Sequence, residues 1–435
     1  MMKARLSLSG LLTIALVTPL MGQSLSDVER RIASEVDAAA EEAIALLERT
    51  VNLNSGSMNF DGVREIGVLF REEFDRLGFE TEWIDGASFE RAGHLVARRE
   101  GSGPKLLLIG HLDTVFEPTS PFQSFVRDGD RATGPGVVDM KGGNVVIVHA
   151  LKALQVSGQL DRMSITIVMT GDEERSGRPL DLARADLIAA AEWADIAIAF
   201  ENGDGNPATA VVARRGSTGW RLEVGGNPAH SSQIFQPEVG AGAIYEASRI
   251  LTAFYDRLAG QPLLTFNPGV ILGGTDVEYD AFTSGGSAFG KSNVVAEGVV
   301  VTGDLRTITL DQLEEARATM RVATTENLPS TSASITFSDG YPPLAPTDGN
   351  HALLARFSQV SQDLSMGEVA AVDPRNAGAA DVSFTAGLVD MALDGLGPGG
   401  GNAHTVEEWI DLPTLAIQTK RAAVLMHRLT LRPGA

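Results

Sequence analysis

The stretch LLLIGHLDTVF, residues 106–116, places a histidine and an aspartate directly after a run of apolar residues. The length and continuous hydrophobicity of that run are typical of a strand buried on both faces of a parallel sheet. His111 and Asp113 are two positions apart, so on an extended chain their side chains point to the same face. Ligands of open α/β sheets gather at the carboxyl ends of strands, and the sequence therefore predicts a functional site at this strand end.

The composition indicates a globular protein of more than one domain. The chain has 435 residues, of which 43% are hydrophobic and 21% are charged, and this is enough for a large core. Its formal charge of −21 excludes nucleic acid and anionic lipid surfaces as favoured partners, because polyanions would be repelled. The absence of cysteine excludes disulfides, thiolate metal sites and a cysteine nucleophile, so any metal site must use histidine and carboxylate ligands.

The N-terminus has the three parts of a secretory signal. Lys3 and Arg5 precede an apolar run, residues 6–20, and small residues follow it. A membrane-spanning helix needs roughly 20 apolar residues, so this run is short for a stable membrane anchor. We expect residues 1–22 to be a cleaved signal peptide and the mature protein to be secreted or periplasmic. An uncleaved anchor and a buried helix are the alternatives.

Short apolar runs alternate with helical patterns on both sides of a central segment. Strands are predicted over residues 81–84, 94–98, 105–112, 164–170 and 195–200. One long amphipathic helix is predicted over residues 24–53, with a capping box of Ser26 and Glu29 at its start, and another helix over residues 180–194. Continuous apolar strands separated by helices predict an α/β fold, with a mixed, mostly parallel sheet sandwiched by helices.

The central segment, residues 216–339, has a different order of predicted strands and helices. After an alternating strand its elements are predicted as helix 241–258, strand pair 292–308, helix 310–325 and a last strand, 332–338. This order is typical of an inserted α+β domain of the ferredoxin-like kind. We therefore predict a catalytic domain in two parts, residues 23–215 and 340–435, interrupted by a lid domain. The glycine-rich residues 273–290 are expected to form a rim over the pocket.

Further acidic residues and a histidine follow the other predicted strands or stand in glycine-rich turns: Asp139 in GPGVVDMKGG, Asp172, Glu173 and Glu174 after residues 164–170, Glu201 after residues 195–200, and His404 in GPGGGNAHT. So dense a group of carboxylates repels itself unless cations neutralise it. Zn²⁺ binds histidine nitrogen and carboxylate oxygen, and two such ions about 3.5–4 Å apart can share a ligand and a water. Each motif alone has a structural alternative, such as a packed histidine or a helix cap, but their co-occurrence favours a metal site.

The order HLDTV, GxGxxDMKGG, DEE, FE and AHT resembles the dinuclear zinc exopeptidases. That family includes glutamate carboxypeptidase, acetylornithine deacetylase, succinyl-diaminopimelate desuccinylase and the aminoacylases. The likeness spans residues 42–427 and is nearest to the glutamate carboxypeptidase branch. It implies the fold predicted above, a zinc exopeptidase-like catalytic domain with an inserted lid.

The resemblance implies two Zn²⁺ ions per subunit, with Asp139 as the bridging ligand. His111 and Glu201 would complete the site of one ion. Glu174 and His404 would complete the site of the other. Nitrogen and oxygen donors of this kind also accept Co²⁺ or Mn²⁺. The peptide bond after the bridging aspartate is cis in the family, which implies a cis bond here.

The resemblance also assigns catalytic roles around the metal pair. Glu173 would be the general base for a water that bridges the metals. Asp113 would orient the ring of His111 through its other nitrogen. In the lid, His230 would stabilise the tetrahedral oxyanion.

Three further positions would hold the substrate's free carboxylate: Asn293, Arg306 and the backbone of Gly378. An arginine suits this task because its planar fork donates two parallel hydrogen bonds. Pairing of Arg306 with Asp304 is the structural alternative. In dimeric members of the family the lid histidine and asparagine reach the partner's site, which implies a homodimer through the lid.

These features favour an exported metallopeptidase that hydrolyses an amide bond next to a free carboxylate and releases a C-terminal amino acid. An aminoacylase, deacetylase or dipeptidase acting on N-acyl amino acids is the nearest alternative, and an inactive binding module is a remote one. His149 and His427 lie in apolar helical stretches and are interpreted as packing residues. Arg214 and Arg215 are interpreted as either specificity residues or solvated surface.

Overall fold

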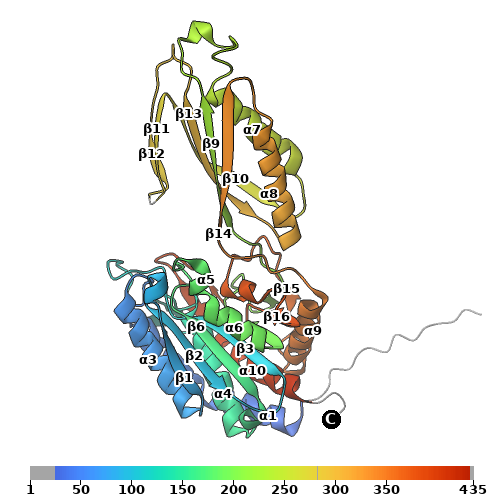
Figure 1. Cartoon of the computed structure of the whole chain (residues 1–435). Helices are drawn as coiled ribbons and strands as arrows, with labels where there is room; N and C mark the ends of the chain where they lie inside the picture. The colour runs from blue at the N-terminus through green and yellow to red at the C-terminus, as the bar shows by residue number, and fades with distance from the viewer. Residues whose placement is uncertain (1–24, 282, 432–435) are drawn as a thin grey trace, which may run out of the picture.

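The structure, a computed structural model, describes residues 25–281 and 283–431. The predicted signal peptide, residues 1–22, lies outside the described residues. Figure 1 shows two parts, a larger body that contains both ends of the described chain and a smaller lid that extends beyond it. In the described part of the chain, no helix has the length and apolar character needed to cross a membrane.

The body is built on a six-stranded mixed sheet whose strands, in spatial order, are β1 (Glu80–Asp85), β2 (Gly93–Arg99), β6 (Ser164–Thr170), β3 (Lys105–His111), β7 (Ile196–Ala199) and β16 (Met391–Leu393). β6, β3, β7 and β16 run parallel to one another. β1 and β2 pair antiparallel at one edge, and β2 is antiparallel to β6. The predicted α/β class with a mixed sheet is confirmed.

The central strand β3 shows why the sheet is covered on both faces. Leu106 and Leu108 belong to one hydrophobic layer, and Leu107 and Ile109 belong to another on the opposite face. All four side chains are buried. A strand with apolar residues in every position has no face to present to water, so helices must cover both sides of its sheet.

Helices lie on both faces of this sheet (Figure 1), and their bounds are α1 (Asp27–Ala38), α2 (Ala40–Val51), α3 (Phe60–Arg76), α4 (Lys141–Val156), α5 (Leu180–Ala183), α6 (Ala185–Trp193), α9 (Asp348–Asp363) and α10 (Leu412–Thr430). α6 packs on the layer of Leu107, whereas α4 and α10 pack on the layer of Leu108. His149 in α4 and His427 in α10 are buried, which confirms that they are packing residues. Short strands complete the body: β4 (Val126–Asp128), β5 (Arg131–Thr133), β8 (Thr209–Ala210), β15 (Ala370–Ala371), β17 (Gly400–Gly401) and β18 (Trp409–Asp411).

The single helix predicted over residues 24–53 is wrong, because the chain turns at Ala39 between α1 and α2. Ala39 has φ −97° and ψ 7°, outside helical geometry. The capping box at the start of α1 is confirmed. Ser26 Oγ accepts a hydrogen bond from the Glu29 N–H at 3.2 Å, and Glu29 Oε2 accepts one from the Ser26 N–H at 2.7 Å. The apolar spacing continues across the turn, so the local sequence does not mark it.

The lid is a four-stranded antiparallel sheet with two helices on one face. Its strands, in spatial order, are β10 (Thr265–Gly274), β13 (Gly298–Arg306), β9 (Thr218–Gly226) and β14 (Thr331–Asp339), and its helices are α7 (Ala243–Leu258) and α8 (Leu310–Thr325). Along the chain these elements follow the ferredoxin-like order of strand, helix, two strands, helix and strand. Trp220, Leu222, Phe254 and Met320 belong to a hydrophobic core that the lid forms by itself.

Most of the described residues of the segment 273–290 form a regular hairpin packed on the lid instead of a free rim, and residues 273–274 end β10. Its strands, β11 (Asp276–Asp280) and β12 (Gly285–Phe289), pair antiparallel. The ring centroid of Tyr279 lies 5.1 Å from the guanidinium carbon of Arg221. Arg221 points to the open face of the lid sheet, because its neighbours Trp220 and Leu222 point into the core. The hairpin therefore covers part of the face that the helices leave open.

Two connectors join the lid to the body: the first connector, residues 214–217, and the second connector, residues 340–344. They pair with each other. The Arg214 N–H donates to the Leu344 carbonyl at 3.0 Å, and the Leu344 N–H donates back to the Arg214 carbonyl at 2.9 Å. The first and second connectors thus form one hydrogen-bonded unit between body and lid.

Candidate metal centre

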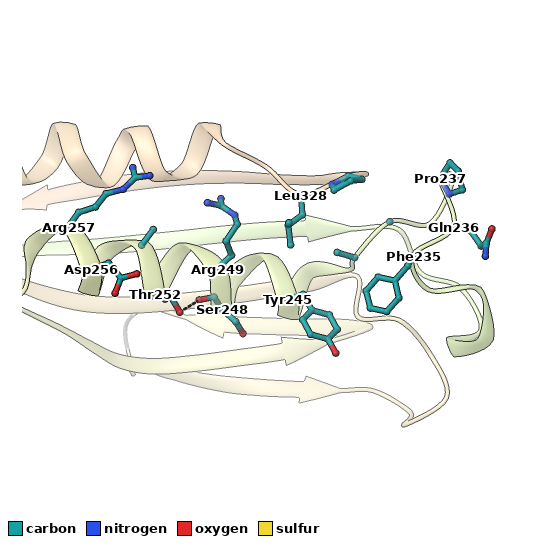
Figure 2. A pocket seen from close by; sticks show the side chains of 14 residues that line it. Phe235, Gln236, Pro237, Tyr245, Ser248, Arg249, Thr252, Asp256, Arg257 and Leu328 are labelled. Atoms are coloured by element: carbon teal, nitrogen blue, oxygen red, sulfur yellow. Dashed lines mark hydrogen bonds between the residues drawn. The ribbon is translucent and has the colours of Figure 1, made fainter.

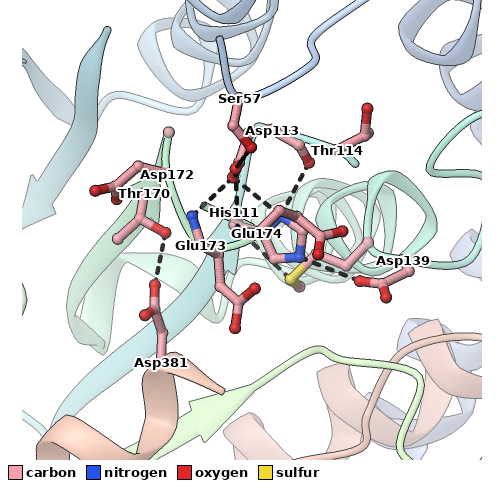
Figure 3. Close-up of polar contacts among 12 residues, drawn as sticks. Ser57, His111, Asp113, Thr114, Asp139, Thr170, Asp172, Glu173, Glu174 and Asp381 are labelled. Atoms are coloured by element: carbon pink, nitrogen blue, oxygen red, sulfur yellow. Dashed lines mark hydrogen bonds and ion pairs between the residues drawn. The ribbon is translucent and has the colours of Figure 1, made fainter. Parts of the chain in front are cut away.

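Three neighbouring strands of the body bring acidic residues to one place. β3 ends at His111. Glu173 and Glu174 follow β6, and Glu201 follows β7. Since β6, β3 and β7 are adjacent and parallel, their carboxyl ends lie at the same edge of the sheet. Figure 3 shows the side chains of His111, Glu173 and Glu174 gathered there.

Two groups of side chains at this edge have the composition of metal sites: His111 with Asp139 and Glu201, and Asp139 with Glu174 and His404. In each group the candidate ligand atoms lie within 4.8 Å of one another. His111 Nε2 is 3.2 Å from Asp139 Oδ1 and 3.3 Å from Glu201 Oε1. His404 Nε2 is 3.0 Å from both Asp139 Oδ2 and Glu174 Oε2. The two oxygens of Asp139 thus face different groups, which is the arrangement that a bridging ligand needs.

Asp113 organises both His111 and the loop that follows β6. Its carbonyl oxygen lies 3.0 Å from His111 Nδ1, and its Oδ1 lies 3.4 Å from the same nitrogen. A proton on Nδ1 leaves Nε2 with the lone pair that a metal requires. The Asp113 carboxylate also accepts hydrogen bonds from Ser57 Oγ at 2.6 Å and from the N–H groups of Glu173 and Glu174 at 3.0 and 3.1 Å (Figure 3). Glu174 belongs to a ligand group and Glu173 to neither, so adjacent glutamates have different surroundings.

Asp139 is supported by a carboxylate that the sequence analysis missed. Glu408 Oε1 accepts hydrogen bonds from the N–H groups of Val138 at 2.9 Å and Asp139 at 3.1 Å, and its Oε2 accepts one from Gly136 at 3.2 Å. The peptide bond that follows Asp139 is cis, as the resemblance implied. Glu408 is 1% exposed, whereas its neighbour Glu407 is exposed. No local pattern separates these two glutamates, so only the tertiary structure identifies the supporting one.

Burial makes the ionised forms of the three glutamates of this site, Glu173, Glu174 and Glu201, unfavourable in the absence of a cation. Burial raises the pKa of Glu173 well above its usual range, and the nearby charge of Glu201 contributes. Burial, followed by the charge of Asp139, raises the pKa of Glu201 to about 7. Hydrogen bonds to Asp139 and Glu174 raise the pKa of His404 to about 11. Divalent cations would relieve the mutual repulsion, so the charges as well as the donor atoms fit a metal site.

A buried arginine holds the start of the loop after β6. Arg184 stands between α5 and α6, so the single helix predicted over residues 180–194 is wrong. Its Nη1 donates to Asp172 Oδ1 at 2.6 Å, and its Nε donates to Asp381 Oδ1 at 2.8 Å. Arg184 and Asp172 are both fully buried. A buried guanidinium needs carboxylate partners, and the interruption of the helix lets it reach them. Asp172 is therefore a supporting residue and belongs to neither ligand group.

Arg214 also has a buried supporting position, although the sequence left its surroundings open. Its Nη2 lies 2.7 Å from Asp394 Oδ2, and its Nη1 donates to the Gly378 carbonyl at 2.6 Å. Asp394 Oδ1 in turn accepts a hydrogen bond from the Glu201 N–H at 3.2 Å. The first connector is thus linked through one carboxylate to the loop that carries Glu201.

The structure does not bring the predicted lid residues together. Arg306 ends β13 at the connector end of the lid, where its Nε donates to Asp304 Oδ2 at 2.7 Å. The pairing that the sequence analysis gave as the alternative is therefore present. His230 and Asn293 lie beyond the start of β13, where His230 is exposed and forms a β-bridge with Val294. The 9 residues of β13 span about 26 Å at roughly 3.3 Å per residue, so the two sets stand at opposite ends of the lid.

Residues 107–428 match the model of a protein family described as peptidase family M20/M25/M40. The chain belongs to this family. The resemblance to dinuclear zinc exopeptidases is confirmed at the level of the family, and the protein is an enzyme of the M20 metallopeptidase class. An inactive binding module is disfavoured further because the ligand groups and Glu173 are all present.

Its relatives include two kinds of hydrolase. Carboxypeptidase G2 from Pseudomonas sp. (strain RS-16) is 26% identical over 403 residues, which cover 90% of this chain and 91% of that protein. Succinyl-diaminopimelate desuccinylase from Gluconacetobacter diazotrophicus is 30% identical over 225 residues, covering 50% of this chain and 57% of that protein. The first likeness extends over almost the whole chain, lid included.

Solved M20 structures share the fold. Aminopeptidase PepT from Bacillus cereus has a TM-score of 0.71 at 18% identity, covering 90% of this chain and 99% of that chain. The YXEP protein of Bacillus subtilis, described as a dinuclear metal-binding peptidase of the M20 family, has a TM-score of 0.61 at 14% identity, covering 91% and 99%. These comparisons establish the architecture.

Proposed function

We propose that the protein hydrolyses an amide bond next to a free carboxylate and releases the C-terminal amino acid of a small peptide or N-acyl substrate. The observation that carries this proposal is the pair of ligand groups that share Asp139, with Glu173 beside them and in neither group. The likeness to carboxypeptidase G2 over 90% of the chain supports it.

The donor set supports two Zn²⁺ ions per subunit as the resident metals. Each group offers one imidazole nitrogen and two carboxylates, which are ligands that zinc takes in catalytic sites. The same donors would accept Co²⁺ or Mn²⁺. When bound, the two cations would polarise the substrate carbonyl and lower the pKa of a water held between them.

The chain's own residues supply the proton transfers and the substrate contacts. Glu173 accepts the proton of the attacking water and hands it to the departing amine. Asp113 holds the N–H group of Glu173, and this fixes the start of the loop from which the base acts. His230 donates a hydrogen bond to the oxygen that becomes negatively charged in the transition state.

The substrate's free carboxylate would bind at the junction of lid and body. Arg215 Nη1 donates to Thr265 Oγ1 at 2.9 Å, and Thr265 stands directly opposite Arg306 in the β10–β13 register. Two guanidinium groups at neighbouring positions attract an anion, and each has a planar fork that fits a carboxylate. Asn293 and the backbone of Gly378 would complete the pocket.

We further propose a homodimer through the lid. The length of β13, about 26 Å, separates Arg306 from the end of the lid where His230 and Asn293 lie, so one chain does not place all three around one substrate. A second subunit could supply its own His230 and Asn293, if the end of its lid that carries them lies against this site. This assignment makes each site dependent on both subunits.

The surface of α7 offers an apolar face for that contact. Phe235 and Tyr245 are 66% and 57% exposed, and their ring centroids lie 5.8 Å apart. They line a hollow of about 1000 Å³ that continues along α7 to Arg257 (Figure 2). Ile244, also on α7, and Ile271, on the edge strand β10, are likewise exposed. An exposed apolar surface next to an edge strand suits a second copy of the same lid, which can cover both.

A matched substrate panel tests the proposed reaction on purified protein. The panel compares acyl-glutamates, acetyl-amino acids and dipeptides, each beside the same compound with its terminal carboxylate converted to an amide. We expect hydrolysis of the acids and at least tenfold weaker hydrolysis of the amides, because a charged hydrogen bond to arginine contributes roughly 1.5–3 kcal/mol. Equal rates for acids and amides would contradict the proposal. Metal content is measured on the same sample.

The panel also separates the nearest alternative. The relative from Gluconacetobacter diazotrophicus is named a succinyl-diaminopimelate desuccinylase, so an N-acyl amino acid hydrolase is the second candidate. Preference for short acyl groups over peptidyl groups would favour it. Rates that depend mainly on which amino acid is C-terminal would favour the carboxypeptidase.

We also propose that the protein is exported, because residues 1–22 have the composition of a cleaved signal peptide. The N-terminal sequence of the mature protein, isolated from cells, tests this. A mature chain that still begins at Met1 would contradict it.

A further inference from the structure

The second connector contacts the loop that carries Glu173. The Tyr341 hydroxyl donates a hydrogen bond to the Glu173 carbonyl at 2.9 Å and accepts one from Arg184 Nη2 at 2.9 Å. Ser176 Oγ, on the same loop, lies 3.3 Å from that hydroxyl. A side chain of the interdomain connector is therefore bound to residues 172–177, which we call the base loop.

The backbone of Tyr341 is tied to the lid side of the junction. Its carbonyl accepts a hydrogen bond from the Ser217 N–H at 2.8 Å, and the Gly340 N–H donates to the Ser217 carbonyl at 3.1 Å. Ser217 and Gly340 are the residues that lead directly into β9 and out of β14. The main chain of Tyr341 is thus hydrogen-bonded to the lid side of the junction, while its hydroxyl is hydrogen-bonded to the base loop.

The contact lies in a buried, charged environment. Arg184 is fully buried, and its guanidinium carbon lies 5.6 Å from the ring centroid of Tyr341. The same guanidinium holds Asp172, the first residue of the base loop. In such surroundings a hydrogen bond is electrostatically stronger than in water, and a lost partner is not readily replaced.

We propose that Tyr341 is a positioning residue. Its hydroxyl holds the backbone of Glu173, so the position of the second connector determines the position of that backbone. This inference rests on the proposed role of Glu173 as general base. Asp113 binds the N–H group of Glu173 and Tyr341 binds its carbonyl, so the peptide groups on both sides of the base are held. A movement of the lid that shifts the second connector is transmitted to the carbonyl of Glu173. The position of the lid is thereby linked to the direction in which the Glu173 side chain points.

Tyr341→Phe tests the proposal, because it removes the hydroxyl and keeps the ring. Tyr279→Phe, in the β11–β12 hairpin on the open face of the lid sheet, is the matched control, because it keeps the ring that packs on Arg221. We expect kcat of Tyr341→Phe to fall about threefold to tenfold, the worth of one hydrogen bond, with KM and metal content unchanged. Tyr279→Phe should leave all three unchanged. A kcat for Tyr341→Phe within twofold of wild type, or a fall that follows loss of metal, overturns the proposal.

Hydrogen exchange in the metal-free protein without substrate gives a readout that does not depend on turnover. We expect the amides of Glu173 and Glu174 to exchange several-fold faster in Tyr341→Phe than in wild type, while the amides of β3 are unchanged. Equal exchange at the base loop overturns the proposal. If the wild-type protein hydrolyses no member of the substrate panel, the proposed function fails, and the exchange measurement still decides whether Tyr341 holds the base loop.

Discussion

The body and the lid differ in how much of their site a single chain completes. In the body, His404 Nε2 comes within 3.0 Å of Asp139 Oδ2 although the two residues lie in opposite halves of the chain. In the lid, His230 and Arg306 are much closer in sequence but stand at opposite ends of β13. A parallel sheet gathers residues at one edge, whereas an antiparallel lid separates residues that lie at the two ends of one strand.

The two regions also differ in the environment of their polar residues. His111 and Asp113 are buried and satisfied by neighbours within the body. His230 is exposed, and its Nδ1 lies 2.8 Å from Ser232 Oγ, a local contact only. A buried cluster fixes its own geometry, whereas in the proposed dimer the exposed His230 would act only when the partner's surface approaches it. Substitutions in the body should therefore have larger effects than substitutions in the lid.

The largest effect is expected for the shared ligand of the body. Asp139→Asn keeps the shape of the side chain but removes the negative charge that both groups use. Loss of several kcal/mol of transition-state stabilisation predicts a fall in kcat on the order of 10³-fold, together with loss of bound metal. Steady-state kinetics and elemental analysis of the purified protein measure both. Asp61→Asn, at a fully exposed aspartate, is the control, and an Asp139→Asn protein with two metals and full turnover would remove the basis of the comparison.

The lid is tested next, by mixing two inactive variants. Glu173→Ala impairs the body and His230→Ala impairs the lid, so each homodimer should be nearly inactive. If His230 acts on the partner's site, each mixed dimer has one intact site, and an equal mixture should recover about a quarter of wild-type activity after subunit exchange. Turnover after unfolding and refolding the two proteins together measures this. No recovery, with dimers present by sedimentation, would place His230 in the site of its own chain.

The part of the candidate metal site that β3, β6 and β7 carry was predictable because its residues end or follow strands. The apolar run before His111 and the run SITIVMT before Glu173 both predict buried parallel strands, and the ends of such strands converge. The adjacency of these strands in the sheet is not encoded locally, and the resemblance to a family supplied it. The supporting residues were not predictable in the same way. Arg184 lies in a helical pattern, and its buried partner Asp381 is 197 positions away.

A supporting residue of the body gives the third prediction. Glu408→Gln removes the charge that receives the N–H groups next to Asp139, while its size is retained. Partners of this kind change metal affinity by about 10- to 100-fold, so we expect weaker metal binding with kcat nearly restored at high metal concentration. Competition with a chelator measures the affinity. Glu407→Gln is the control because that neighbour is exposed, and equal affinities in both variants would mean that Glu408 only fills space.

The lid was predicted less completely than the body for a physical reason. The order of its strands and helices follows from alternation and periodicity, but residues 273–290 contain so many glycines that a loop was expected. Within them DVEYD, residues 276–280, alternates acidic and apolar side chains, and this alternation forms β11. Glycine permits a turn without excluding a strand, and here the strand β11 pairs with β12 and its Tyr279 packs on Arg221.

The smallest effect is expected at Arg306, the lid residue proposed to bind the substrate's carboxylate. Arg306→Lys keeps the charge and loses the planar fork, so KM for substrates with a free carboxylate should rise about tenfold while kcat changes little. The ion pair with Asp304 offers a second explanation for such a rise, because the substitution also alters that pair. Asp304→Asn separates the two, since it leaves Arg306 intact and removes a competitor for it. A KM at or below the wild-type value in Asp304→Asn supports carboxylate binding by Arg306. An equal rise in both variants would mean that the ion pair shapes the lid and that the substrate's carboxylate binds elsewhere.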